Sequence, residues 1–218
     1  MVLQAKGIDY KVIEIQPGIE QISIFRLSGQ KQLPVMVDEG IIIHDSSQII
    51  RYIEKKCPEP QLIPTNTQLA TQVHLIEDWA DTTLARATQN YLLKAATSNS
   101  ALRTALIRNN FPPLFQQLLQ RLPYKLLNTA TDLINFDESS GLIDSLTNLS
   151  DLLIHQKWIV GAELSFADIA VAAQLSLIRF PPSYGKPLAG MGCHGLSDNP
   201  KFQNLFAWKD RLDTALFN

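Results

Sequence analysis

The sequence is poor in cysteine and has no cluster of charges of one sign. Its two cysteines, Cys57 and Cys193, lie far apart and form no C-x-x-C pair, so they cannot build a disulfide framework, which fits a reducing compartment. Lys and Arg number 19 against 21 Asp and Glu, without a basic run, which argues against nucleic acid and anionic membrane as partners. Small neutral or acidic partners remain open.

Long apolar segments and metal-ligand spacings are absent as well. The start, MVLQAKG, has no apolar region of the kind found in signal peptides, and no stretch reaches the roughly 18 apolar residues of a membrane span. The four histidines form no H-E-x-x-H motif and have no cysteine partners at ligand spacing, so we expect no metal site. Together these absences predict a soluble, cytoplasmic protein.

The apolar pattern divides the chain into two domains of different class. The Pro-spaced stretch CPEPQLIP separates a part with strand-like alternation from a part with helical stripes only. We predict an α/β domain at 1–58, a linker at 59–65 and an all-helical domain at 66–218.

The first domain carries signals for strands and helices. Gly7 is typical of a helix end, and Asp38-Glu39-Gly40 is a turn signal between two β-branched runs. The predicted elements are a helical tail over 1–6, a strand over 10–15, a helix over 19–27, a hairpin of 35–37 and 41–43, and a helix from an Asp45 cap to about Lys56.

The second domain shows helical spacing throughout. Apolar residues step by three and four along each segment. The predicted helices are one over 66–91, two or three shorter ones over 98–135 broken at Pro112-Pro113 and Pro123, one with the stripe Leu142, Leu146, Leu149 and Leu153, and a last one capped by Asn199 with Pro200 in its first turn. Trp79 is expected in the core or at a dimer contact rather than at a ligand.

The segment Leu164-Ser165-Phe166-Ala167-Asp168 is the sharpest local motif of the second domain. Ser165 can cap the backbone while Asp168 reaches back to the Ser165 amide, which is a capping box. The run that follows, IAVAAQLSLI, is apolar on nearly every side, so this helix is expected at the centre of its domain. The motif predicts structure, not binding.

Two places in the first domain have the chemistry of a binding site. Pro34 marks the start of a strand, and a cis Leu33-Pro34 bond would turn the backbone groups of Leu33 outward to pair with a peptide-like ligand; the alternative is an ordinary trans edge proline. At Asp45-Ser46 the first-turn amides can hold an anion and the carboxylate an ammonium, which suits an α-amino acid head group; the alternative is a D-x-x-Q cap and no more.

Three segments together resemble the glutathione S-transferase superfamily: AKGIDYKVIEI, SGQKQLPVMVDEGIIIHDSSQIIRYI and GAELSFADIAVAA. The resemblance implies a thioredoxin-like N-terminal domain followed by an all-helical C-terminal domain. It also implies glutathione as co-substrate and commonly a homodimer. By the resemblance, Pro34 matches the family's cis-proline, Leu33 the residue that pairs with the cysteinyl part, and Gln32 a contact to the glycyl end. Asp45 and Ser46 match the pair that holds the γ-glutamyl group.

The sequence departs from the family at its start. Family members open with a strand and a loop that carries the Tyr, Ser or Cys activating the glutathione sulfur, and this sequence begins after that point, so the catalytic residue is unknown. In the thioredoxin-like arrangement this strand would lie between the predicted strands at 10–15 and 35–37. Without it, the backbone hydrogen-bonding groups of those two neighbours would be left unpaired. A start codon placed too late and a degenerate copy both fit.

Two further features stay open. Cys193-His194 offers a thiol beside an imidazole, but neighbours in a chain rarely face each other. These residues lie in a Pro/Gly-rich loop, 181–200, that is long for a connector, and we hypothesise that it borders a second-substrate pocket.

Three functions compete. The first is a glutathione transferase that joins the glutathione thiol to small electrophiles, as in detoxification. The second is a non-catalytic glutathione-binding or scaffold protein of the same fold. The third is a glutathione-dependent isomerase or reductase, since a fold does not determine its chemistry.

Overall fold

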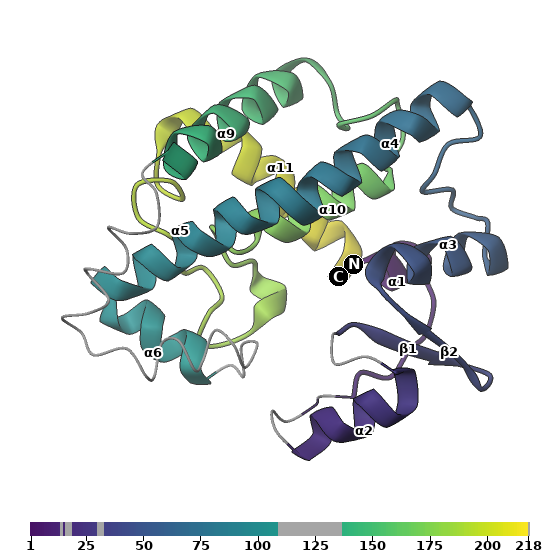
Figure 1. The fold of residues 1–218 in the computed structure, drawn as a ribbon. Helices are drawn as coiled ribbons and strands as arrows, with labels where there is room; N and C mark the ends of the chain where they lie inside the picture. The colour runs from purple at the N-terminus through teal and green to yellow at the C-terminus, as the bar shows by residue number, and fades with distance from the viewer. Residues whose placement is uncertain (14, 16–18, 30–32, 109–136, 218) are drawn as a thin grey trace. The chain divides into compact units, whose positions relative to one another are not determined.

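A computed structural model describes residues 1–13, 15, 19–29, 33–108 and 137–217 of the chain. The described chain separates into two compact units, Val2–Leu62 and Met1 with Ile63–Asn218. The first is a small α/β unit with a two-stranded sheet and the second contains helices (Figure 1). This is the predicted class, a thioredoxin-like N-terminal part followed by a helical part.

The α/β unit is built around one hairpin. Strands β1 (Val35–Asp38) and β2 (Ile41–His44) pair antiparallel, with Val35 opposite His44 and Asp38 opposite Ile41. The two turn residues, Glu39 and Gly40, have φ values of 49° and 86°, the positive values that a type I′ turn needs to match the strand twist. The predicted hairpin is confirmed, each strand one residue longer.

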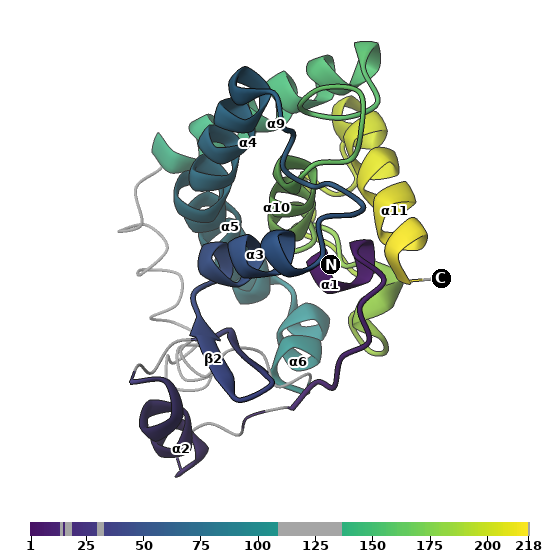
Figure 2. The same ribbon diagram turned by 90° about the vertical axis from the view of Figure 1, so that its right-hand side faces the viewer.

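Three helices complete this unit: α1 (Val2–Ala5), α2 (Ile19–Ser28) and α3 (Ser46–Lys56). Helices α2 and α3 both pack on β2, and Figures 1 and 2 show the hairpin between them. Helix α3 buries Ile49, Ile50 and Ile53, which lie on one face by their helical spacing.

The short helix α1 ends as predicted at Gly7. Gly7 has a φ of 61°, its N–H donates to the Gln4 carbonyl, and the Ile8 N–H donates to the Leu3 carbonyl. This pair of bonds is a Schellman motif, in which the left-handed residue is most often glycine because it has no Cβ. The motif turns the chain out of the helix.

The predicted strand over 10–15 is wrong for the residues that the structure describes. Residues 10–13 and 15 carry no strand assignment, and Val12 and Ile13 are 69% and 72% exposed. Alternating residues are suited to a strand, but a strand exists only with a hydrogen-bonded neighbour, and here the sheet consists of β1 and β2. The local pattern is strand-like, but no segment that the structure describes pairs with it.

One long helical path opens the second unit. It runs through α4 (Thr67–Trp79), the π-helical segment η1 (Ala80–Leu84) and α5 (Ala85–Ser98). Asn66 caps its start by accepting from the Gln68 and Leu69 amides at 3.0 and 3.1 Å. The predicted helix over 66–91 is therefore present, but it is longer and contains a π-helical turn.

The other helices described in this unit are α6 (Ser100–Arg108), α9 (Asp137–His155), α10 (Phe166–Leu175) and α11 (Gln203–Phe217), with short 3₁₀ turns η2 (Pro182–Tyr184) and η3 (Pro200–Phe202). Helix α10 packs on α4, η1, α5 and α11, and Figure 2 shows it between α4 and α11. Its residues Phe166 to Ala172 are all buried, which confirms the predicted central helix. In α9, Leu142, Leu146 and Leu149 are buried as predicted.

The last helix starts as predicted at Asn199, which accepts from the Lys201 amide at 3.0 Å, although the first turn is 3₁₀. Of the shorter helices predicted over 98–135, α6 is present, and Pro112, Pro113 and Pro123 lie outside the described residues. In the described part of the chain, no helix is long and apolar enough to cross a membrane.

Candidate functional site

The candidate site lies where the hairpin meets the start of α3. Because Val35 pairs with His44, the residues just outside that pair, Pro34 and Asp45, lie at the same end of the hairpin. The register therefore brings together the two features that the sequence suggested separately. Gln32 lies outside the described residues.

The Leu33-Pro34 peptide bond is cis, the alternative that sequence alone left open. Leu33 is 58% exposed, and Pro34 is exposed just before the first residue of β1. Both residues of this dipeptide thus lie at the surface of the unit.

Asp45 caps α3 in an uncommon backbone conformation. Its φ and ψ are 73° and 130°, its carboxylate Oδ1 accepts from the Gln48 amide at 3.1 Å, and its carbonyl accepts the first helical bond, from Ile49, at 3.0 Å. A non-glycine residue at positive φ is strained and is found most often at turns and functional sites. Asp45 is exposed, so the cap and ligand binding are compatible: one oxygen accepts from the helix, and the other has no hydrogen-bond partner among the described residues.

Ser46 is the first residue of α3 and is half-buried. Amides in the first turn of a helix have no intrahelical acceptor and favour negative charge. Ser46 also interacts with another part of the protein. What it adds to the site is its place at the positive end of an eleven-residue helix.

His44, one of the four histidines weighed as metal ligands, is the last residue of β2 and directly precedes Asp45. Among the described residues, the His44 Nδ1 is the one buried side-chain polar atom that has no hydrogen-bond partner. The signal in the sequence was its position, the last residue of a strand directly before a helix cap. Such an atom costs free energy unless a partner is supplied.

Among the described residues of this site, Leu33, Pro34, Asp45 and Ser46, there is no cysteine or tyrosine. Cys57 follows the C-terminal end of α3, about 18 Å along the helix from Asp45 by the rise per residue. The Tyr52 hydroxyl donates to Asp38 at 2.7 Å, which raises the pKa of Tyr52. The catalytic residue stays unassigned.

Cys193 and His194 do not form a nucleophile pair. Cys193 is fully buried and donates to the Leu177 carbonyl, and burial raises the pKa of its thiol to about 12. The His194 side chain is 92% exposed and lies 3.2 Å from Asp198. The two side chains point to different environments, as expected for neighbours in a chain.

The capping box at Ser165 and Asp168 is structural, as predicted. The Asp168 carboxylate accepts from the Ser165 amide at 2.9 Å, the Ser165 hydroxyl at 2.7 Å and the Ile159 amide at 2.7 Å. Burial raises the pKa of Asp168, and these hydrogen bonds act in the opposite direction. The contact to Ile159 was not foreseen; it ties the preceding loop to α10.

The described residues hold no group of three or more His, Cys, Asp or Glu side chains placed for a metal ion. The loop 181–200 is packed on the helices: Leu188, Cys193 and Leu196 are buried, and the Phe180 amide donates to the Met191 carbonyl at 2.9 Å. Trp79 is half-buried at the end of α4. The roles proposed for the loop and for Trp79 stay predictions.

Comparison with known proteins gives these positions a context. Residues 1–61 match the family model described as "Glutathione S-transferase, N-terminal domain". Over 81 residues the chain is 36% identical to the maleylacetoacetate isomerase of Rattus norvegicus, a match that covers 35% of this chain and 38% of that protein. Over 123 residues it is 24% identical to a stringent starvation protein A homolog of Pasteurella multocida, covering 54% of this chain and 57% of the relative. The chain thus matches less than two thirds of the length of either relative.

Solved structures extend the likeness to the whole chain. Glutathione S-transferase 1-6 from Anopheles dirus species B aligns with a TM-score of 0.65 at 14% identity, covering 100% of this chain and 83% of that one. The beta-etherase LigF of Sphingobium sp. strain SYK-6 aligns with a TM-score of 0.65 at 22% identity, covering 99% and 89%. At these identities the likeness establishes the fold.

Proposed function

We propose, for a chain that belongs to the glutathione S-transferase superfamily, that its N-terminal unit binds glutathione and that the protein transfers the glutathione thiol to small electrophiles. The observation that carries this proposal is the register of the hairpin, which puts Pro34 and Asp45 at one end. Glutathione is a tripeptide with an ammonium group, a peptide backbone and two carboxylates. The residues at this end of the hairpin can bind several of these groups.

Each part of glutathione is assigned to a residue. The Asp45 carboxylate takes the ammonium of the γ-glutamyl group, and the first-turn amides at Ser46 take its α-carboxylate. The exposed backbone of Leu33, before Pro34, pairs with the cysteinyl part as a neighbouring strand would. Gln32 is proposed for the glycyl end. The group that stabilises the thiolate is not among these residues.

Calorimetric titration with glutathione tests the binding site. Asp45→Asn keeps an acceptor oxygen for the Gln48 amide and removes the charge, so the helix cap survives while the ammonium loses its partner. We expect binding to weaken tenfold to a hundredfold, about 1.5 to 3 kcal/mol. Glu39→Gln is the matched control, because Glu39 is an exposed carboxylate at the other end of the same hairpin. Wild-type affinity in Asp45→Asn would remove Asp45 from the site.

A second ligand sharpens this test. Cysteinylglycine lacks the γ-glutamyl group, so it should bind the wild type much more weakly than glutathione. In Asp45→Asn the difference between the two ligands should shrink, because the variant has lost the charge that recognises the γ-glutamyl ammonium. An undiminished difference would place the γ-glutamyl group elsewhere.

A glutathione-dependent isomerase is the second candidate, favoured by the 36% identity over 81 residues to a maleylacetoacetate isomerase. Transfer to chlorodinitrobenzene consumes glutathione in proportion to product, whereas isomerisation of maleylacetoacetate leaves the glutathione concentration unchanged. Assaying both substrates separates the two activities. Glutathione binding without either reaction would favour the non-catalytic, scaffold function.

We further propose that the protein is a homodimer in the cytoplasm. The likeness to the family supports this proposal. Sedimentation equilibrium at several protein concentrations measures the mass of the assembly. A mass of 24.4 kDa at all concentrations would contradict the dimer.

A further inference from the structure

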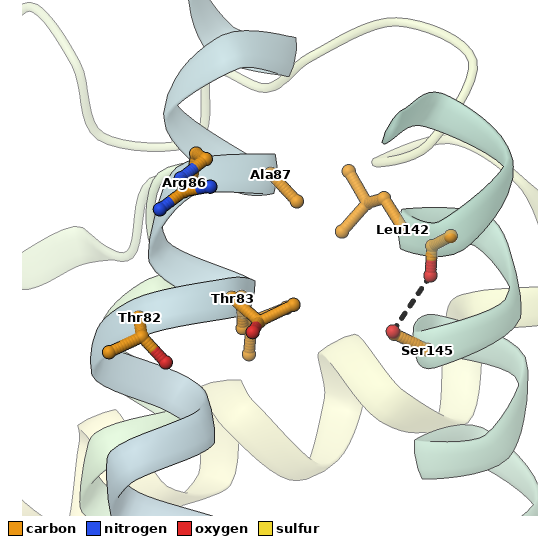
Figure 3. A pocket seen from close by; sticks show the side chains of 8 residues that line it. Thr82, Thr83, Arg86, Ala87, Leu142 and Ser145 are labelled. Atoms are coloured by element: carbon orange, nitrogen blue, oxygen red, sulfur yellow. Dashed lines mark hydrogen bonds between the residues drawn. The ribbon is translucent and has the colours of Figure 1, made fainter. Parts of the chain in front are cut away.

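A pocket of about 330 Å³ opens in the helical unit, between the middle of the long helical path and the first turns of α9. This is near the lower end of the range of about 300 to 1,000 Å³ for small-molecule sites. Thr82, Thr83, Arg86 and Ala87 line it on one side, and Leu142 and Ser145 on the other (Figure 3). All of them belong to one compact unit, and none belongs to the proposed glutathione site.

The pocket coincides with the π-helical turn η1. Thr82 and Thr83 lie within it, and Arg86 and Ala87 follow in α5. Figure 3 shows Thr83 and Ala87 on the side that faces Leu142 and Ser145. A π-helical turn interrupts the regular ladder, is rare, and is found frequently at functional sites.

The hydrogen bonds already present decide which ligand chemistry the lining can serve. Thr82 donates its hydroxyl to the Asp78 carbonyl at 2.6 Å, and Ser145 donates to the Gly141 carbonyl at 2.7 Å (Figure 3). Both oxygens are left with acceptor capacity only. Thr83 and Arg86, in contrast, make no side-chain hydrogen bond or ion pair with another residue of the described chain. The donors that remain are one hydroxyl and one guanidinium.

The other groups of the lining are apolar or absent. Leu84, Ala87 and Leu142 supply the apolar lining, of which Ala87 is half-buried while Leu84 and Leu142 are each 1% exposed, and Gly141 presents no side chain. A Cβ added at Gly141 would meet no atom within 4 Å, so this position borders open space. The nearest carboxylates in the sequence, Asp81 and Asp144, are not among the described lining residues.

We propose that this pocket binds a small carboxylic acid with an apolar body, at a site separate from that for glutathione. The guanidinium of Arg86 pairs with the carboxylate, a planar group that it can grip with two parallel bonds, and the Thr83 hydroxyl donates a third bond. The apolar body packs on Ala87 and Leu142. An uncharged analogue of the same shape loses the pairing with Arg86 and keeps the packing.

Phenylacetate is the probe, titrated into the full chain and followed by methyl NMR and calorimetry. Saturable binding is expected with a Kd of about 1 mM or tighter, as befits so small a ligand, together with shifts of the Thr83, Ala87 and Leu142 methyl resonances. Phenylacetamide should bind the wild type at least tenfold more weakly. Absence of saturable binding, or shifts confined to other residues, would overturn the proposal.

Three variants localise the interaction. Arg86→Met should weaken phenylacetate at least tenfold and abolish the preference over phenylacetamide, while Arg211→Met, a matched change of an exposed arginine on α11, should leave both unchanged. Gly141→Leu should block both probes by occupying the open space. Should that variant fail to fold, the Arg86→Met comparison decides: an unchanged ratio of the two affinities in Arg86→Met contradicts the site.

Discussion

The Lys6 ammonium and the Glu54 carboxylate lie 2.6 Å apart, with the lysine side chain fully buried and the glutamate 14% exposed. Lys6 also donates to the carbonyls of Cys57 and Pro58, at 2.8 and 3.3 Å. Glu54 accepts in addition from the Leu62 amide at 3.2 Å. One buried lysine thus ties the start of the chain, the C-terminal end of α3 and the segment that follows it.

Replacing Lys6 should destabilise the α/β unit strongly. Lys6→Met removes three donors and leaves Glu54 and two carbonyls without their partner, for which we expect a loss of about 2 to 4 kcal/mol. Hydrogen exchange of the α3 amides measures the stability of this unit separately from that of the helical unit. Lys55→Met, an exposed neighbour on the same helix, is the control and should change stability by under about 0.5 kcal/mol. An equal effect of both variants would show that the buried contacts of Lys6 are energetically minor.

The Asp38 carboxylate should titrate at unusually low pH. It accepts hydrogen bonds from Lys56 and, at 2.7 Å, from Tyr52, and these lower the pKa of Asp38, with Lys56 as the larger cause. Because the folded pKa lies below the unfolded one, this contribution to stability is present above the unfolded pKa. It is lost as pH falls through the folded pKa.

Carbon NMR of the Asp38 carboxyl checks the shift. We expect a midpoint below the value of about 3.9 found in model peptides, and a return toward it in Lys56→Met. At the alkaline end, the same hydrogen bond raises the pKa of Lys56 to about 12, so its contribution to stability should be complete below the unfolded pKa of about 10.5 and be lost as the pH rises from there through about 12. A midpoint unaffected by Lys56→Met would contradict the assigned cause.

Two substitutions at Asp45 should separate backbone strain from helix capping. Asp45→Ala loses the bond to the Gln48 amide and keeps a side chain at a φ of 73°, so we expect a loss of about 1 to 2 kcal/mol. Asp45→Gly loses the same bond but adopts that φ freely, so its stability should stay within about 0.5 kcal/mol of the wild type. Chemical denaturation of the two variants compares them. A glycine variant as unstable as the alanine variant would mean that the backbone here is unstrained.

Cys193 should be inert to alkylation in the folded protein. Its thiol is buried and its pKa is raised to about 12, so at a pH of about 8 roughly one molecule in ten thousand carries the thiolate that reacts. Mass spectrometry after iodoacetamide treatment should find Cys193 unmodified in the native chain and alkylated in denaturant. Rapid native alkylation would show that the loop 181–200 opens.

The features predicted correctly from the sequence are those that a few neighbouring residues determine. Helix starts at Asp45 and Asn199 follow from side chains that accept from amides three and two positions ahead, and the start at Ser165 follows from Asp168, whose carboxylate accepts from the Ser165 amide three positions back. The hairpin follows from Glu39-Gly40 between β-branched runs for the same local reason. The candidate residues for glutathione came from a resemblance, and their role stays a prediction.

The features missed are those that depend on distant partners. The alternation over 10–15 describes a backbone suited to a strand, but a strand is made by the segment beside it, which no window of six residues contains. The π-helical turn at Ala80–Leu84 and the bond from Ile159 to Asp168 likewise depend on how helices pack.

By itself, then, the amino-acid order determined three things: the division into an α/β part and a helical part, the starting points of most helices, and the turn of the hairpin. It could do so because capping, turn chemistry and apolar spacing act over a few residues. Only the tertiary structure decided that Pro34 and Asp45 share one end of a hairpin, that Lys6 reaches Glu54, and that a pocket opens beside Arg86. The physical reason is that pairing register and packing bring together groups far apart along the chain, and local preferences do not specify which ones meet.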